Sequence, residues 1–138
     1  MNELQYGQLK QAVHPVVSQL TEKLIWQPDQ RFDAVVTEVP RPLLEQVRKE
    51  LAQLYPHQWD KKTIRQAPHL IRRGAGLFAQ MENSQVLFTN QGSESEQVMA
   101  AWWPWGPDAP VSLRLFKSDV NKQAVPLTFI EKVKALFN

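Results

Sequence analysis

The residues best suited to bind a charged partner are five basic side chains that lie within one short window of the chain. They are Lys61, Lys62, Arg65, Arg72 and Arg73. Outside residues 60–73 the chain carries eleven basic and thirteen acidic residues, so its net charge of +2 at pH 7 resides in this window. Because a basic patch attracts anions, we expect these five side chains to form an anion-binding surface.

The charge pattern changes abruptly after Arg73. Residues 74–113 contain no Lys or Arg, although they make up forty positions of the chain. Strands that are buried need few charged side chains. We therefore expect the step to mark the passage from a helical, water-facing first half to a buried run of strands.

Four tryptophans are the second set of candidate contact residues. They are Trp59, Trp102, Trp103 and Trp105. If residues 97–103 form a strand, Trp102 and Trp103 point to opposite faces of the sheet, because successive side chains alternate. One of these two rings is then available to contact a partner, unless helices or a second copy of the chain cover both faces of the sheet. Tryptophan is common in contacts with ligands and with partner proteins.

These features suggest two kinds of binding protein. The first is a small, non-catalytic binding or adaptor domain, in which residues 102–105 line a groove for a protein or a small-molecule ligand beside the basic patch. The alternative is a nucleic-acid-binding protein, in which residues 61–73 contact phosphates and tryptophan rings stack on bases. A third interpretation assigns no function, since basic residues often form a solvated face and tryptophans often fill a core.

Signatures of catalysis and of cofactor binding are weak. The three histidines, His14, His57 and His69, match no usual metal-ligand spacing, although His57 and His69 flank the basic window and have the chemistry for proton transfer. Gly74 and Gly76 lack the remainder of a dinucleotide-binding motif. With no cysteine, the chain excludes disulfides and thiolate catalysis. We expect no metal or cofactor, assign no catalytic residue, and place a small histidine-based enzyme last among the functions.

The composition indicates a folded domain outside the membrane. The 138 residues are 43% hydrophobic, and we expect a single domain over 1–138 that buries about two thirds of its unfolded surface. No apolar run approaches the ~20 residues that span a bilayer, and the first residues lack a signal-peptide pattern. We therefore expect a cytoplasmic protein without a membrane partner.

Apolar periodicity predicts two helices before the basic window. The first covers 3–25 with a kink at Pro15, and the second covers 43–54. A run of β-branched residues predicts a strand over 32–39 between them. After Asp60, which has the chemistry of a helix cap, we expect a short helix that places Lys61, Lys62 and Arg65 on one face.

The second half of the chain is expected to be mainly strands. A strand presents Arg72 or Arg73, and a hairpin then joins 77–81 to 85–89. Two more strands follow at 97–103 and 111–116, and a closing helix near 127–137 reaches the C-terminus.

The order of these elements predicts an α+β fold. It consists of an antiparallel meander of about four to five strands, packed through one face against the N-terminal helices and a C-terminal helix. The uncharged segment 97–105 would also suit the edge of a homodimer.

Overall fold

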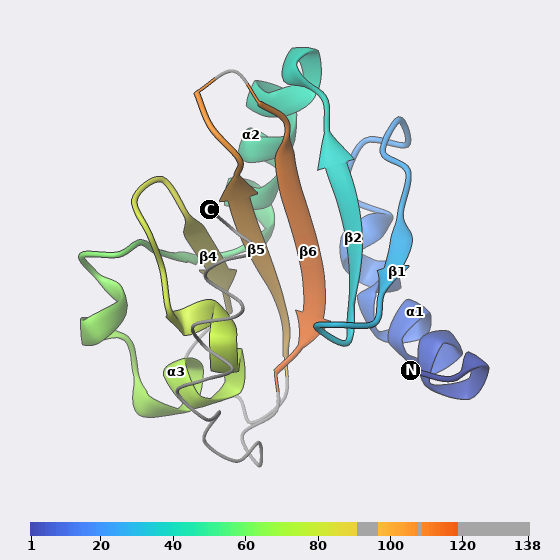
Figure 1. Ribbon diagram of the computed structural model, residues 1–138, viewed down its shortest axis with the longest axis horizontal. Helices are drawn as coiled ribbons and strands as arrows, with labels where there is room; N and C mark the ends of the chain where they lie inside the picture. The colour runs from blue at the N-terminus through green and yellow to red at the C-terminus, as the bar shows by residue number, and fades with distance from the viewer. Residues whose placement is uncertain (91–96, 108, 119–138) are drawn as a thin grey trace.

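The computed structural model describes residues 1–90, 97–107 and 109–118, and all six strands in these ranges belong to one antiparallel sheet (Figure 1). The strands are β1 (Gln27–Asp29), β2 (Ala34–Val39), β3 (His57–Trp59), β4 (Val86–Thr89), β5 (Val98–Pro104) and β6 (Val111–Lys117). The predicted α+β class is confirmed, but six strands exceed the four to five that were expected. The predicted C-terminal helix lies outside the described residues.

The strand order in the sheet is β1-β2-β6-β5-β4-β3. Strands β3 to β6 therefore form a meander, and the β1–β2 hairpin is added along β6, with β2 antiparallel to β6 from Ala34↔Phe116 to Val39↔Val111. Since β5 pairs with both β4 and β6, residues 97–105 are not at an edge, and the prediction of a dimer edge there is wrong. Within the described chain, the outer strands are β1 and β3.

Three α-helices and three short 3₁₀ helices accompany the sheet in the described ranges. The α-helices are α1 (Glu3–Val17), α2 (Leu44–Leu54) and α3 (His69–Ala75), and the 3₁₀ helices are η1 (Arg41–Leu43), η2 (Ile64–Gln66) and η3 (Gly76–Ala79). Asn2 caps α1 by accepting a hydrogen bond from the Gln5 backbone N–H at 2.8 Å. α1 contains Pro15 and ends at Val17, not near residue 25. At its C-terminal end, Ser18 Oγ donates a hydrogen bond to the Pro15 carbonyl oxygen at 3.1 Å, which satisfies one of the carbonyl groups that a helix end leaves without a partner.

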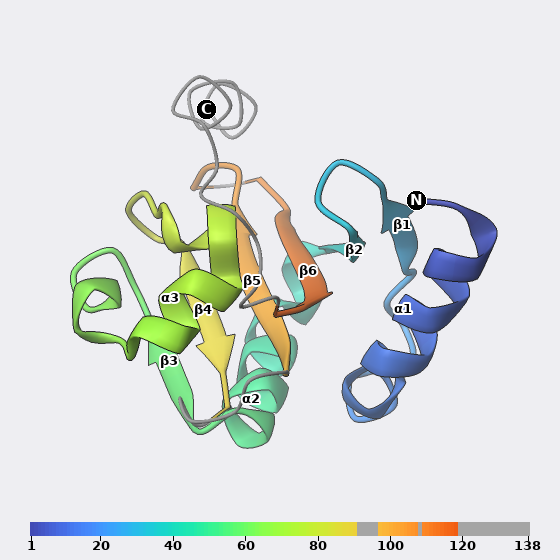
Figure 2. The same cartoon turned by 90° about the horizontal axis from the view of Figure 1, so that it is seen from below.

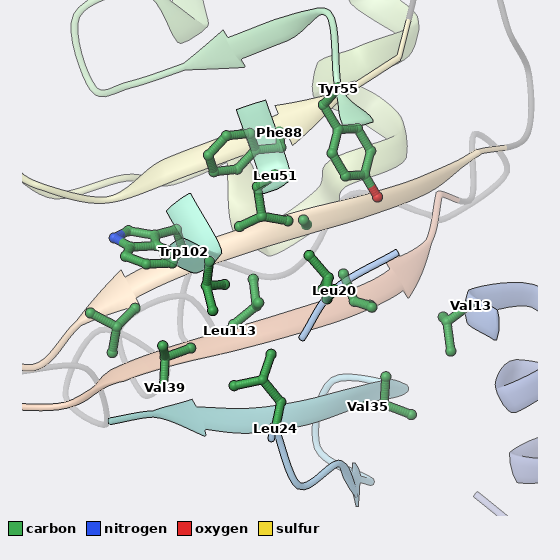
Figure 3. Close-up of a cluster of buried hydrophobic side chains, with 14 of the residues drawn as sticks. Val13, Leu20, Leu24, Val35, Val39, Leu51, Tyr55, Phe88, Trp102 and Leu113 are labelled. Atoms are coloured by element: carbon green, nitrogen blue, oxygen red, sulfur yellow. The ribbon is translucent and has the colours of Figure 1, made fainter. Parts of the chain in front are cut away.

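Helices cover both faces of the sheet, so the prediction that they pack on one face is wrong (Figure 2). α1 and α2 pack on the first face, where Leu51, Phe88 and Trp102 contribute to one core (Figure 3). η2, α3 and η3 pack on the opposite face around Ile71, Phe78, Met99, Trp103 and Phe116. The sequence Val98–Trp103 is apolar at every position, which is typical of a strand buried on both faces.

The segment from His69 to Ala79 is helical, which corrects two predictions. Arg72 and Arg73 are not on a strand, and 77–81 does not form a hairpin with 85–89, because β4 pairs with β3 and β5 instead. Ile71 and Ala75 are four residues apart on α3 and both are buried, which is the pattern of a helical face, and Phe78 on η3 is buried in the same core. Gly76, with φ 57° and ψ −123°, separates α3 from η3 in a conformation that favours glycine.

Gly74 lets α3 approach the end of β6 closely. A Cβ atom at this position would lie 3.0 Å from Ser118 Cβ and 3.5 Å from Met99 Cε. We therefore expect Gly74→Ala to lower the free energy of unfolding by about 1–3 kcal/mol, in spite of the higher helix propensity of alanine. Chemical denaturation measures this change directly.

Gly7 provides a matched control for that substitution. It lies inside α1, where an added Cβ atom would meet nothing within 4 Å. Gly7→Ala should therefore stabilise the protein by about 0.5–1 kcal/mol, following helix propensity alone. Equal stabilisation by the two substitutions would contradict the close packing at Gly74.

Candidate functional site

The basic window begins with a turn that Asp60 organises. Asp60 Oδ1 accepts hydrogen bonds from the backbone N–H groups of Lys62 and Thr63, both at 2.9 Å, and Thr63 Oγ1 accepts one from the Asp60 N–H at 2.9 Å. The Thr63 backbone hydrogen bond is the largest of the influences that hold the pKa of Asp60 below its usual range. The predicted helix over Lys61–Thr63 is thus a turn, and the 3₁₀ helix η2 starts only at Ile64.

The five predicted anion-binding side chains are all exposed on the layer formed by the Asp60 turn, η2 and α3. Lys61 Nζ lies 3.6 Å from Glu82 Oε2, and both partners are about half exposed, so the pair is weak. The other four have no carboxylate oxygen within 4 Å of their cationic nitrogens among the described residues. We call these four the η2–α3 surface: Lys62, Arg65, Arg72 and Arg73.

The short helix α3 separates its apolar and basic residues. Ile71, Gly74 and Ala75 are buried against the sheet. Arg72 and Arg73 are exposed together with His69, and the spacings of three and four residues place them on neighbouring positions of the helix surface. Burial of the apolar side therefore holds the two arginines on the outer face of this layer.

The four candidate tryptophans are not gathered at one place. Trp102 is 6% exposed in the first core and Trp103 is 2% exposed in the second, which confirms that they point to opposite faces. Trp105 is 43% exposed, follows the end of β5 and donates from Nε1 to Ser112 Oγ. Trp59 is half-buried on the edge strand and donates from Nε1 to Thr89 Oγ1 at 2.9 Å. Only Trp59 adjoins the basic window along the chain, and a binding role for these rings stays a prediction.

The histidines are dispersed over separate elements. His14 lies on α1, His57 on β3 and His69 at the start of α3, and all three are exposed. The His57 ring stacks on Trp59 with a centroid distance of 5.8 Å. In the described ranges, no group of three or more His, Asp or Glu side chains could hold a metal ion.

A hollow of about 460 Å³ lies on the outer side of α2 and contains no histidine. Its lining residues are Pro42, Glu45, Gln46, Lys49, Glu50 and Gln53.

Arg48 is a candidate functional residue that the sequence did not single out. Its guanidinium Cζ lies 5.4 Å from the Phe88 ring centroid and 5.5 Å from that of Trp102, and Nη2 donates to Gln58 Oε1 at 3.4 Å. Burial lowers the pKa of Arg48. A signal was present in the sequence, because Arg48 lies four residues after Leu44 and three before Leu51, beside the apolar stripe of its helix.

A buried ion pair on the other face was also missed. Arg114 Nε donates to Asp29 Oδ2 at 2.9 Å, and the two side chains are 3% and 5% exposed. The Phe32 ring centroid lies 4.9 Å from the guanidinium. Burial lowers the pKa of Arg114, while the hydrogen bond and the charge of Asp29 act in the opposite direction. The sequence signal for such a pair is a charged residue between two apolar neighbours, Leu113 and Leu115, inside a strand.

The fold and these surfaces define an α+β protein with an antiparallel sheet, a basic outer layer and a partly buried arginine near one sheet edge. No protein-family model matches the chain, and no similar protein was found among curated sequences or among solved structures. None of the helices in the described ranges is long and apolar enough to cross a membrane.

Proposed function

We propose that the protein is a non-catalytic binding domain that recognises an acidic segment of a partner protein through the η2–α3 surface. The observation that carries this proposal is the exposure of four basic side chains on consecutive elements, with no carboxylate within 4 Å among the described residues. Like charges gathered in this way repel one another and attract an anion. An acidic segment that binds there relieves the repulsion and forms charge-assisted hydrogen bonds.

The surroundings of this surface favour a protein partner over a nucleic acid. Binding of single-stranded nucleic acid combines basic side chains with exposed aromatic rings that stack on bases. Trp102 and Trp103 are buried, and Trp59 is half-buried with its indole N–H bound to Thr89. The basic side chains supply the electrostatic part of such a site, whereas these three rings offer little surface for stacking. Nucleic-acid binding is therefore the second candidate.

Reversing the charge of two arginines on α3 tests the proposal. We expect Arg72→Glu/Arg73→Glu to weaken binding of a fluorescein-labelled peptide of alternating Glu and Ser about tenfold, or ~1.4 kcal/mol, at low ionic strength. Fluorescence anisotropy measures the affinity, and it should fall with added salt because exposed charges are screened.

A second double variant controls for the change in net charge. Lys10 and Lys23 are exposed, and α1, which carries Lys10, lies well away from α3 (Figure 2). Lys10→Glu/Lys23→Glu changes the net charge by the same amount and should leave the affinity nearly unchanged. Equal weakening by both double variants would refute a localised site. Binding of a labelled single-stranded oligonucleotide without binding of the acidic peptide would favour the second candidate.

A further inference from the structure

Strand β3 offers an open edge at one end of the sheet (Figure 2). It pairs only with β4 among the described strands, in the register His57↔Thr89, Gln58↔Phe88 and Trp59↔Leu87. Gln58 therefore projects to the same face as Phe88, the face that α2 covers, whereas His57 and Trp59 project to the opposite face. The outer backbone groups of an edge strand are available to pair with another extended segment.

Arg48 places a positive charge beside this edge. Two aromatic rings support its guanidinium, and its hydrogen bond to Gln58 Oε1 directs Nη2 toward β3. A guanidinium has five N–H donors, and Gln58 is its single hydrogen-bond acceptor among the described residues. Arg48 can therefore bind a further acceptor without breaking a contact to a carboxylate.

The nearby acids of α2 are engaged elsewhere. Glu45 lies 3.3 Å from Lys49 Nζ, and Glu50 Oε1 accepts a hydrogen bond from the Thr21 backbone N–H at 3.0 Å. In the described ranges, no carboxylate oxygen lies within 4 Å of an Arg48 nitrogen. A partly desolvated cation is costly unless an anion pairs with it, and ring contacts compensate only in part. This environment favours an incoming carboxylate.

We propose that the β3 edge and Arg48 together bind an extended segment of a partner protein that carries an acidic residue opposite Gln58. Residues directly opposite in paired strands project to the same face, so this residue lies on the Arg48 side. Its carboxylate receives charge-assisted hydrogen bonds from the guanidinium. The flanking residues project toward His57 and the half-buried ring of Trp59, which suits apolar side chains.

Charge complementarity favours this occupant over a second copy of the chain. Antiparallel pairing of two β3 strands about Gln58 would place both copies of Arg48 on the same face and close together, where their like charges repel. An acidic segment instead neutralises Arg48. After β3 the chain continues through Asp60, whose carboxylate is bound to the backbone N–H groups of Lys62 and Thr63, and then through Lys61 and Lys62, whose positive charge also favours an acidic segment.

A pair of blocked peptides tests the proposal with the full-length protein. The probes are acetyl-Ser-Thr-Val-Glu-Val-Thr-Ser-amide and the same peptide with Gln in place of Glu. In an NMR titration we expect the backbone amide signals of His57, Gln58 and Trp59 to shift, and the Glu peptide to bind about tenfold more tightly than the Gln peptide. With Arg48→Gln this ratio should fall to about one.

Three further variants show whether the preference for the Glu peptide depends on the Arg48 guanidinium. Arg48→Lys keeps a positive charge without the planar fork and should give an intermediate ratio. Lys49→Gln, on the same helix, and Arg72→Glu/Arg73→Glu, in the η2–α3 surface, should leave the ratio unchanged. The edge site and the function proposed for the η2–α3 surface can therefore fail independently.

The following outcomes would overturn the edge site. They are a ratio that Arg48→Gln does not change, amide shifts confined to α3, absence of shifts in residues 57–59 at millimolar peptide, and a dimer that pairs through the β3 edge and that the Glu peptide does not dissociate. The last outcome would identify a second copy as the occupant.

Discussion

Replacing Asp29 with alanine is expected to lower the free energy of unfolding by about 3–5 kcal/mol, the usual cost of removing one partner from a buried ion pair. Asp29 Oδ2 accepts the hydrogen bond of Arg114 Nε at 2.9 Å, and both side chains are nearly inaccessible. Without the carboxylate, the Arg114 charge stays buried against the Phe32 ring, where water cannot replace the lost charge interaction fully. Urea denaturation of the two proteins measures the difference.

Arg31 supplies the control on the same carboxylate. Its Nε lies 3.5 Å from Asp29 Oδ1, but its side chain is 60% exposed, so Arg31→Ala should cost less than about 1 kcal/mol. The double variant Asp29→Leu/Arg114→Met removes both charges and should recover much of the stability that Asp29→Ala loses. A loss equal to that of Asp29→Ala in Arg31→Ala, or no recovery in the double variant, would show that the buried charge is not the cause.

The Asp29–Arg114 pair also has a topological role. It joins β1 to β6 across β2, between residues 85 positions apart in the chain. Pairing of β1 and β2 by itself allows slippage, because β1 has only three residues. The ion pair and the Phe32 ring above it hold the β1–β2 hairpin in the register that places Ala34 opposite Phe116.

The elements that could be predicted are those with a strong local pattern. Apolar and β-branched runs predicted α2, β2, β4, β5 and β6 to within about two residues. β1 and β3 were missed because Gln27–Asp29 and His57–Trp59 have three residues each and no apolar alternation. Their strand conformation depends on β2 and β4, which are their pairing partners.

The candidate site was predicted only in part, because charge is visible in a sequence and surface position is not. Exposure of the five basic residues fits the expected anion-binding surface, yet the charge step between Arg73 and Gly74 falls inside α3 and does not mark the start of the strands. The expected groove lined by residues 102–105 depended on an exposed ring, but the helical layers bury Trp102 and Trp103 from both sides. Arg48 needed the fold to bring Phe88, Trp102 and Gln58 around it.

The burial of Trp103 leads to the second large expected effect. We expect Trp103→Ala to lower the free energy of unfolding by about 3–5 kcal/mol, since a large buried ring is lost and a cavity is left between β5 and the α3–η3 layer. The Phe78 ring meets Trp103 edge to face, with a centroid distance of 5.4 Å, and stacks on Phe116 at 4.5 Å, so the cavity would open in the centre of this core. Denaturant titration provides the measurement.

Two control variants, Trp105→Ala and Trp103→Phe, test whether the loss of stability in Trp103→Ala comes from removal of its buried ring. Trp105→Ala removes the same side chain from a position that is 43% exposed, and it should cost less than half as much as Trp103→Ala because less apolar surface returns to water. Trp103→Phe keeps an aromatic ring against Phe78 and should fall between them. If Trp103→Ala were no more destabilising than Trp105→Ala, Trp103 would not be a core residue, and its role as a partner contact would regain support. The expected order, in which Trp103→Ala is the most destabilising and Trp105→Ala the least, would instead indicate that Trp103 stabilises the core on which α3 packs. The outer face of α3 carries Arg72 and Arg73.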